Sequence, residues 1–100
     1  MSARYGRKLD TNHKAIVRAL QLLGATVETI QGPAGTPDLV VRAFGFERLV
    51  EVKPPGEGLN PNQRKWWGAW GREATILRTV TDCESLVARM RGQLAKLGAP

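Results

Sequence analysis

Apolar residues recur at helical spacing near the start of this 100-residue chain. Ile16 and Leu20 lie four residues apart within a longer apolar stripe, which is the pattern of a helix with one buried face. Asp10 or Thr11 can cap the N-terminus of this helix, and Gly24 predicts its end. The first nine residues lack the apolar period, so we expect residues 1–9 to form a flexible basic arm and residues 10–100 to form one domain.

Two further helices are predicted in the second half of the chain. Asn60 is a candidate N-cap, with Pro61 at the first helical position and Gln63 completing a capping box, so a helix should run through NQRKWWGAWG. Thr81 and Glu84 form a second capping-box pattern. The helix that follows should present one apolar stripe, which consists of Leu86, Met90, Leu94 and Leu97.

The segments between these helices have the composition of β-strands. Residues 25–30 (ATVETI) and 75–80 (TILRTV) are rich in β-branched residues, and residues 38–53 contain two apolar runs around a glycine. Pro54 and Pro55 end the second of these runs. The order of elements predicts an α/β fold with a small mixed β-sheet flanked by helices.

Charged residues are set into the apolar hairpin of residues 38–53. If Gly45 and Phe46 form a two-residue type II′ turn, Asp38 lies opposite Lys53, and Glu51 shares their face of the sheet. This register predicts that the two carboxylates lie within reach of one cation at the open end of the hairpin.

Two carboxylates on one face repel each other unless a cation lies between them. Mg²⁺ suits such a pair because it binds one or two carboxylates together with phosphate oxygens and waters, and it can activate a water for attack on phosphorus. Lys53 can hold the attacking water or offset charge in the transition state. The alternative is a set of ordinary exposed strand charges, but the apolar surroundings favour a site.

The net charge of +6 and the pI near 10.3 indicate a polyanionic partner, either nucleic acid or a membrane surface, unless the chain simply has a basic bias. The sequence contains no apolar run of 18 residues and no signal-peptide pattern, so no membrane span is expected. The single cysteine, Cys83, excludes an internal disulfide, fits a reducing cytoplasmic location and should be buried. One cysteine and one histidine cannot form a structural zinc site, and no small-molecule cofactor is expected.

The hairpin and its flanking segments resemble a known family. GTPDLVV followed by LVEVK resembles the signature of the PD-(D/E)xK nucleases. NHKAIVRALQLLGATV and LNPNQRKWWGAW resemble the neighbouring segments of archaeal-type Holliday junction resolvases and of the related VRR-NUC domains, which phages often encode. The resemblance implies an αβββαβ nuclease core followed by a C-terminal helix, and it is consistent with a phage-encoded protein in a bacterial host.

The resemblance also implies a role for individual residues. Asp38 and Glu51 correspond to the ligands of Mg²⁺ or Mn²⁺, and the main-chain carbonyl of Val52 corresponds to a further ligand. Lys53 corresponds to the catalytic lysine, and Gln63 to an auxiliary contact with water or phosphate.

One position departs from the family pattern. Resolvases of this type usually carry a glutamate on the first helix, and in this chain the position falls on His13. Imidazole can ligate Mn²⁺ or hydrogen-bond a water, but it suits Mg²⁺ poorly. The alternative is an exposed histidine without a role.

Basic and aromatic residues outside this group are candidates for contact with DNA. The three tryptophans of the second predicted helix form either core and dimer interface, which is the favoured interpretation, or a surface for base stacking. The small loop PAGTP can approach a phosphate through its backbone N–H groups, unless it is only a tight turn. The candidate DNA contacts are Arg4, Arg7 and Lys8 in the arm, Thr36 in the loop, and Arg64 and Lys65 in the helix.

Together these features predict a structure-selective DNA endonuclease that depends on Mg²⁺ or Mn²⁺. A Holliday junction resolvase that makes paired cuts in four-way junctions, acting as a homodimer, is the preferred interpretation. The alternatives are a VRR-NUC-like nuclease that cuts flap, single-stranded or nicked DNA, and a non-catalytic DNA-binding module with the same fold.

Overall fold

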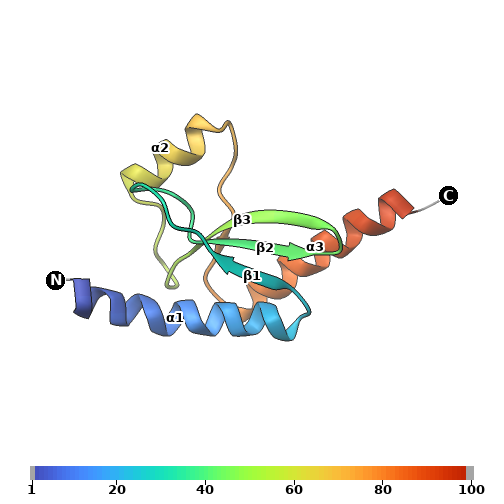
Figure 1. The fold of residues 1–100 in the computed structure, drawn as a ribbon, viewed down its shortest axis with the longest axis horizontal. Helices are drawn as coiled ribbons and strands as arrows, with labels where there is room; N and C mark the ends of the chain where they lie inside the picture. Colours follow the sequence, from blue (N-terminus) through green and yellow to red (C-terminus); the bar gives the residue numbers. More distant parts are fainter. Residues whose placement is uncertain (1, 99–100) are drawn as a thin grey trace.

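The computed structural model describes residues 2–98, with side chains from residue 12 onward. Within this range the elements are α1 (Ser2–Leu22), β1 (Thr26–Thr29), β2 (Leu39–Ala43), β3 (Phe46–Val52), α2 (Pro61–Ala69), β4 (Ile76–Leu77) and α3 (Val80–Gly98) (Figure 1). The strands form one sheet in the order β1-β2-β3-β4, which is antiparallel except for the parallel pair β3-β4. The predicted α/β fold with a small mixed sheet is therefore confirmed. None of the helices in residues 2–98 combines the length and apolarity needed to cross a bilayer.

Helix α1 starts earlier than its predicted cap. It begins at Ser2, so the segment that was expected to be an arm continues the helix, and neither Asp10 nor Thr11 is its N-cap. No proline interrupts residues 2–9, and a helix already nucleated by packing downstream can extend by one hydrogen bond per residue. The predicted core positions Ile16 and Leu20 are buried, and Gly24 ends the helix with a positive φ of 94°.

The hairpin between β2 and β3 has a different turn from the predicted one. Ala43 pairs with Phe46, so the turn residues are Phe44 and Gly45, with φ angles of 57° and 84°. Positive φ at both positions is typical of a type I′ turn, whose twist matches that of the flanking strands. This turn leaves Phe46 in the strand, where it packs against the core together with Phe44.

The turn shifts the β2–β3 register by two residues from the prediction. Because side chains alternate with a period of two, a shift of two residues leaves each of them on its expected face of the sheet. The shift does change the neighbours, since the ladder ends at the pair Leu39–Val50 and Asp38 then lies beside Glu51 rather than opposite Lys53.

The two faces of the sheet are covered differently. Helices α1 and α3 pack against each other and against one face, where Leu39, Val41 and Val50 are buried. Helix α2 lies on the other side of the sheet from α1 (Figure 1) and reaches the opposite face at the end of β3. The site described below lies between this helix and the sheet.

The capping box predicted for α2 is present. The Asn60 side chain accepts a hydrogen bond from the Gln63 amide at 2.9 Å, and the Gln63 side chain accepts one from the Asn60 amide at 2.9 Å. Pro61 occupies the first helical position, as predicted. The box fixes the conformation of Gln63, which lines the cavity described below.

The start and the end of α3 differ from the prediction. Strand β4 is shorter than TILRTV, because Thr79 caps the helix by accepting a hydrogen bond from the Asp82 amide at 3.1 Å. The helix therefore begins at Val80, and the predicted cap at Thr81 is wrong. The apolar stripe is buried only in its first half, since Leu94 and Leu97 lie beyond the sheet and are exposed.

Candidate functional site

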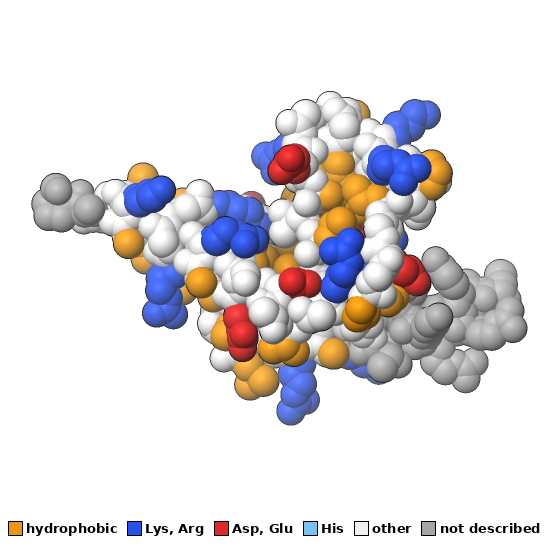
Figure 2. Space-filling view, turned by 180° about the vertical axis from the view of Figure 1, so that it is seen from behind, with side chains coloured by type: hydrophobic (Ala, Val, Ile, Leu, Met, Phe, Trp, Pro, Cys, Tyr) orange, Lys and Arg blue, Asp and Glu red, His pale blue; other side chains and the backbone are white. Residues whose placement is uncertain are grey.

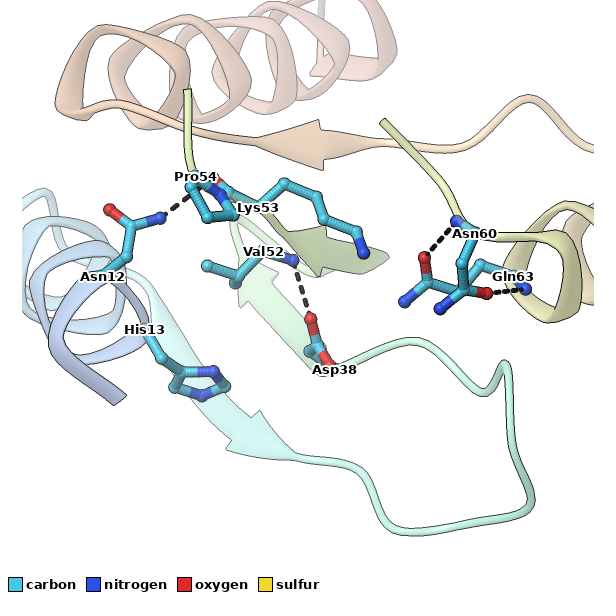
Figure 3. A pocket seen from close by; sticks show the side chains of 8 residues that line it. All are labelled: Asn12, His13, Asp38, Val52, Lys53, Pro54, Asn60 and Gln63. Atoms are coloured by element: carbon cyan, nitrogen blue, oxygen red, sulfur yellow. Dashed lines mark hydrogen bonds between the residues drawn. The ribbon is translucent and has the colours of Figure 1, made fainter. Parts of the chain in front are cut away.

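A cavity of about 260 Å³ lies at the open end of the β2–β3 hairpin. Four segments that are distant in the sequence line it: α1 contributes Asn12 and His13, the start of β2 contributes Asp38, the end of β3 contributes Val52 and Lys53, and the start of α2 contributes Gln63 (Figure 3). The structure therefore brings the acid, the lysine, the glutamine and the histidine singled out in the sequence into one place.

Asp38 is held at the rim of this cavity by its own backbone. Its amide donates to the carbonyl of Val50 at 3.0 Å, and its carbonyl accepts from the Ile30 amide at 2.9 Å, so both neighbouring strands fix its position. Its Oδ2 accepts a hydrogen bond from the Val52 amide at 2.8 Å (Figure 3). A main-chain donor of this kind fixes the orientation of the carboxylate.

Glu51 is fully buried, with no exposed surface. Its Oε1 accepts a hydrogen bond from Gln63 Nε2 at 3.2 Å, and its Oε2 accepts one from Trp67 Nε1 at 3.4 Å. Burial, followed by repulsion from the Asp38 carboxylate, raises the pKa of Glu51 to about 7, although the Trp67 hydrogen bond and the charge of Lys53 lower it. The two carboxyl groups therefore lie close together, and the side chains of Gln63 and Trp67, which donate hydrogen bonds to Glu51, are neutral.

The end of β3 presents Lys53 and the backbone of Val52 to the cavity. The amides of Glu51 and Lys53 donate to β4, at 2.9 Å to the Thr75 carbonyl and 3.1 Å to the Leu77 carbonyl. Since alternate residues of a strand point their backbone groups in opposite directions, Val52 points its amide and carbonyl to the side of Asp38. The Lys53 side chain extends across the cavity toward the start of α2 (Figure 3), while Asn12 Nδ2 donates to the Lys53 carbonyl at 2.9 Å.

Sequence reasoning did not assign a contact with the acid pair to Trp67. This residue is buried and donates its indole N–H to Glu51, whereas Trp66 is half-buried and Trp70 is 65% exposed. The sequence did contain an indication of this contact, because Trp67 lies four residues after Gln63 and residues at this spacing share one face of a helix. Only the docking of α2 on the sheet shows that this face meets Glu51.

The remaining predicted contacts whose side chains the structure describes do not line the cavity. The Thr36 amide donates to the Pro33 carbonyl at 3.1 Å, so it closes a tight turn. Arg64 Nη1 donates to the Leu59 carbonyl at 2.7 Å, and Lys65 is exposed. The side chains of Arg4, Arg7 and Lys8 lie outside the part of the chain whose side chains are described.

The donors at the site suit a hard cation. Asp38 and Glu51 supply carboxylate oxygens and Val52 supplies a carbonyl oxygen, which are the ligand types that Mg²⁺ and Mn²⁺ prefer. Among the side chains described, from residue 12 to residue 98, no group of three or more His, Cys, Asp and Glu residues is arranged to hold a metal ion. A metal here would therefore need waters or substrate oxygens to complete its coordination, which is usual for Mg²⁺.

No protein-family model matches the sequence, and no curated protein matches it. A solved structure described as a VRR_NUC domain matches the fold with a TM-score of 0.58 and 21% sequence identity. The match covers 79% of this chain and 92% of that one. The likeness to VRR-NUC domains stated from the sequence is thus confirmed at the level of the fold, whereas the likeness to archaeal-type resolvases stays a prediction. The chain has the fold of a VRR_NUC domain.

Proposed function

We propose that the chain is a divalent-metal-dependent endonuclease that hydrolyses phosphodiester bonds in DNA. The observation that carries the proposal is the meeting of Asp38, the buried Glu51 and Lys53 at one end of the sheet. The nuclease-type fold and the net charge of +6 support it, since DNA is a polyanion.

Asp38, Glu51 and the Val52 carbonyl would hold the metal, Mg²⁺ or Mn²⁺. The bound metal would supply Lewis-acid activation of a water and stabilisation of the charge that develops on the phosphate. The raised pKa of Glu51 fits this role, because a cation would remove the repulsion from Asp38 that contributes to it.

The other residues of the cavity act on the substrate and on the acid pair. The Lys53 ammonium offsets the negative charge of the scissile phosphate and is within the same cavity as Asp38. The imidazole of His13 can hydrogen-bond the attacking water from the side of α1. Gln63 and Trp67 orient Glu51 from α2, so they are positioning residues.

The substrate is DNA with an irregular structure, because the described fold contains no separate module for reading base sequence. The VRR_NUC-type fold supports cutting of flaps, single strands or nicked duplex, in which one site is sufficient. Resolution of four-way junctions requires two sites, hence a homodimer. The exposed Leu94 and Leu97 on α3 favour this second possibility, since exposed apolar stripes often mark interfaces.

The experiment is cleavage of four end-labelled substrates of matched sequence: a four-way junction, a flap, a nicked duplex and an intact duplex. Each is incubated with Mg²⁺, with Mn²⁺ or with EDTA, and the oligomeric state is measured by sedimentation. We expect metal-dependent cutting of at least one branched or single-stranded substrate, and its loss in Asp38→Asn. Metal-dependent binding without cutting by the folded wild-type chain would support the non-catalytic module instead.

A further inference from the structure

The face of the sheet that carries Glu51 also carries an aromatic groove that the acid site does not use. Leu49 on β3, Trp66 on α2 and Trp70 at the C-cap of α2 line a second cavity of about 110 Å³, and Arg72 forms part of its wall. The rings of Trp66 and Trp70 lie 5.6 Å apart and are tilted by 32°. We call these four residues the aromatic groove. Figure 2 shows hydrophobic side chains gathered between the lobe that contains α2 and the sheet, with Lys and Arg side chains near them.

The groove is accessible and is not part of the core. Trp70 is 65% exposed, and Trp66 and Leu49 are only half-buried, whereas the neighbouring Trp67 is 3% exposed. A large ring left in water is unfavourable unless a partner covers it. Trp67 therefore belongs to the core, whereas Trp70 lies on the surface, where both a dimer interface and base stacking remain open from the sequence.

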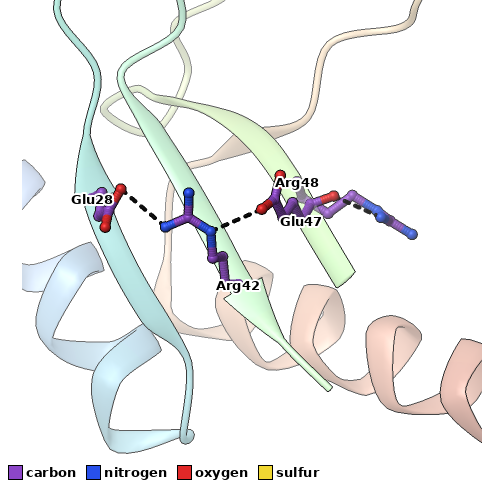
Figure 4. Close-up of polar contacts among 4 residues, drawn as sticks. All are labelled: Glu28, Arg42, Glu47 and Arg48. Atoms are coloured by element: carbon purple, nitrogen blue, oxygen red, sulfur yellow. Dashed lines mark hydrogen bonds and ion pairs between the residues drawn. The ribbon is translucent and has the colours of Figure 1, made fainter. Parts of the chain in front are cut away.

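The surroundings favour a flat polyanionic ligand over a protein surface. The rest of this face carries ion pairs, in which Arg42 contacts Glu28 and Glu47 at 2.9 Å each (Figure 4). The apolar side chains that line the groove are two rings and one leucine, which provide far less area than a stable interface of roughly 1,000 Å² or more. The cation in the groove wall, Arg72, suits a phosphate or the face of a base.

The position of the groove relative to the acid site suggests what this ligand is. Leu49 and Glu51 lie on one face of β3, and Lys53 continues this alternation just after the strand, so Leu49 of the groove and Lys53 of the cavity are about 13 Å apart along the chain at ~3.3 Å per residue. A stacked strand advances ~3.4 Å per nucleotide, so this distance spans about four stacked nucleotides and fewer stretched ones. Helix α2 contacts both places, because Trp67 binds Glu51 while Trp66 and Trp70 line the groove.

We propose that the aromatic groove stacks one unpaired base of the DNA strand that is cut, and so selects substrates with a single-stranded or opened segment beside the scissile phosphate. The position of the stacked base beside a scissile phosphate rests on the proposed nuclease function. Base stacking itself can be measured without cleavage. In paired DNA the base is stacked within the duplex and cannot enter the groove, so duplex DNA should bind without this contribution.

The test uses full-length chain carrying Asp38→Asn, which prevents cutting, with Mg²⁺ and a fluorescently labelled single-stranded 12-mer. In a series of probes, one nucleotide at a time is made abasic, and the same series is measured with Trp70→Ala added. We expect one or two adjacent abasic positions to weaken binding roughly 5- to 100-fold when Trp70 is present, and to have no effect in its absence. Blunt duplex of the same length should bind equally well to both forms.

Three further measurements separate the alternatives. Trp70→Phe should retain part of the position-dependent effect, and Leu97→Ala, which removes an exposed apolar side chain from α3, should retain all of it. A uniform response to abasic positions, unchanged by Trp70→Ala, would overturn the proposal. So would sedimentation that shows a wild-type dimer converted to monomer by Trp70→Ala, because a second copy of the chain would then cover the groove. If wild-type chain cuts no DNA but the position-dependent stacking is found, the stacking proposal stands and the nuclease function fails.

Discussion

Replacing Glu51 by glutamine should stabilise the metal-free protein while abolishing its activity. Glu51 is fully buried beside Asp38, and its pKa is raised from 4.5 to about 7. The folded chain therefore keeps the Glu51 proton up to about pH 7, whereas the unfolded chain releases it near 4.5. Between these values the folded state binds more protons, so the free energy of unfolding falls as the pH rises through this window.

The size of the effect follows from the pKa difference. At pH 8 both states are ionised, and a difference of this size corresponds to about 3 kcal/mol of lost stability relative to a neutral group. At pH 5 the folded state has kept its proton and the loss is about 1 kcal/mol. Glutamine carries no charge, and its amide nitrogen replaces one of the two oxygens that accept from Gln63 and Trp67, at a cost that does not depend on pH. The advantage of Glu51→Gln over wild type should therefore be larger at pH 8 than at pH 5 by roughly 2 kcal/mol.

Urea unfolding in EDTA at pH 5 and pH 8 measures this difference. With an m-value of about 1–2 kcal/mol/M for a chain of this size, the midpoint of Glu51→Gln should exceed that of wild type by roughly 1–2 M at pH 8. Glu57→Gln, which removes an exposed carboxylate, is the matched control and should shift neither midpoint appreciably. Added Mg²⁺ should stabilise wild type at pH 8 and have a much smaller effect on Glu51→Gln. A variant that is less stable than wild type at pH 8, or equally changed at both pH values, would refute the assignment of Glu51 as a buried, repelled carboxylate.

Three other changes test how the site is positioned. Gly35→Ala should destabilise the chain and reduce cleavage, because a Cβ there would lie 2.4 Å from the Asn62 carbonyl oxygen and would displace the start of α2. Gly24→Ala is the control, since Gly24 also has a positive φ but its Cβ would meet no atom within 4 Å. This control should lose stability without a comparable loss of cleavage in the same assay. Trp67→Phe removes the indole donor to Glu51, so urea unfolding should show a loss of about 1–3 kcal/mol at pH 8 and a smaller loss at pH 5; equal losses at both values would mean that only packing was removed. His13→Glu adds a third carboxylate to the cavity and should increase the thermal stabilisation by Mg²⁺ relative to that by Mn²⁺, whereas unchanged metal responses would place His13 outside the metal environment.

The local signals in the sequence determined the parts of the fold that depend on neighbouring residues. The capping box of Asn60 and Gln63, the helix end at Gly24 and the strand composition before and after the hairpin each involve interactions within a few residues. The apolar stretches also identified the buried face of the sheet, because a two-residue period survives an even shift of register. For the same reason, Asp38, Glu51 and Lys53 could be assigned to one face although the predicted turn was wrong.

The tertiary structure decided what these residues contact. Phe44–Gly45 and Gly45–Phe46 are both possible turns in the sequence, and the choice depends on packing of the two phenylalanines against the core. The cap of α3 at Thr79 was likewise hidden by a strand-like composition, since strand propensity depends strongly on context.

The environment of Glu51 could not be obtained from the sequence for a related reason. Its pKa depends on full burial and on the docking of α2, which brings the Trp67 indole to its carboxylate from 16 residues away. His13 and Asp38 line the same cavity because α1 packs against the sheet. Sequence patterns specify residue types and faces, whereas the distances that set charge and reactivity arise when separate elements pack together.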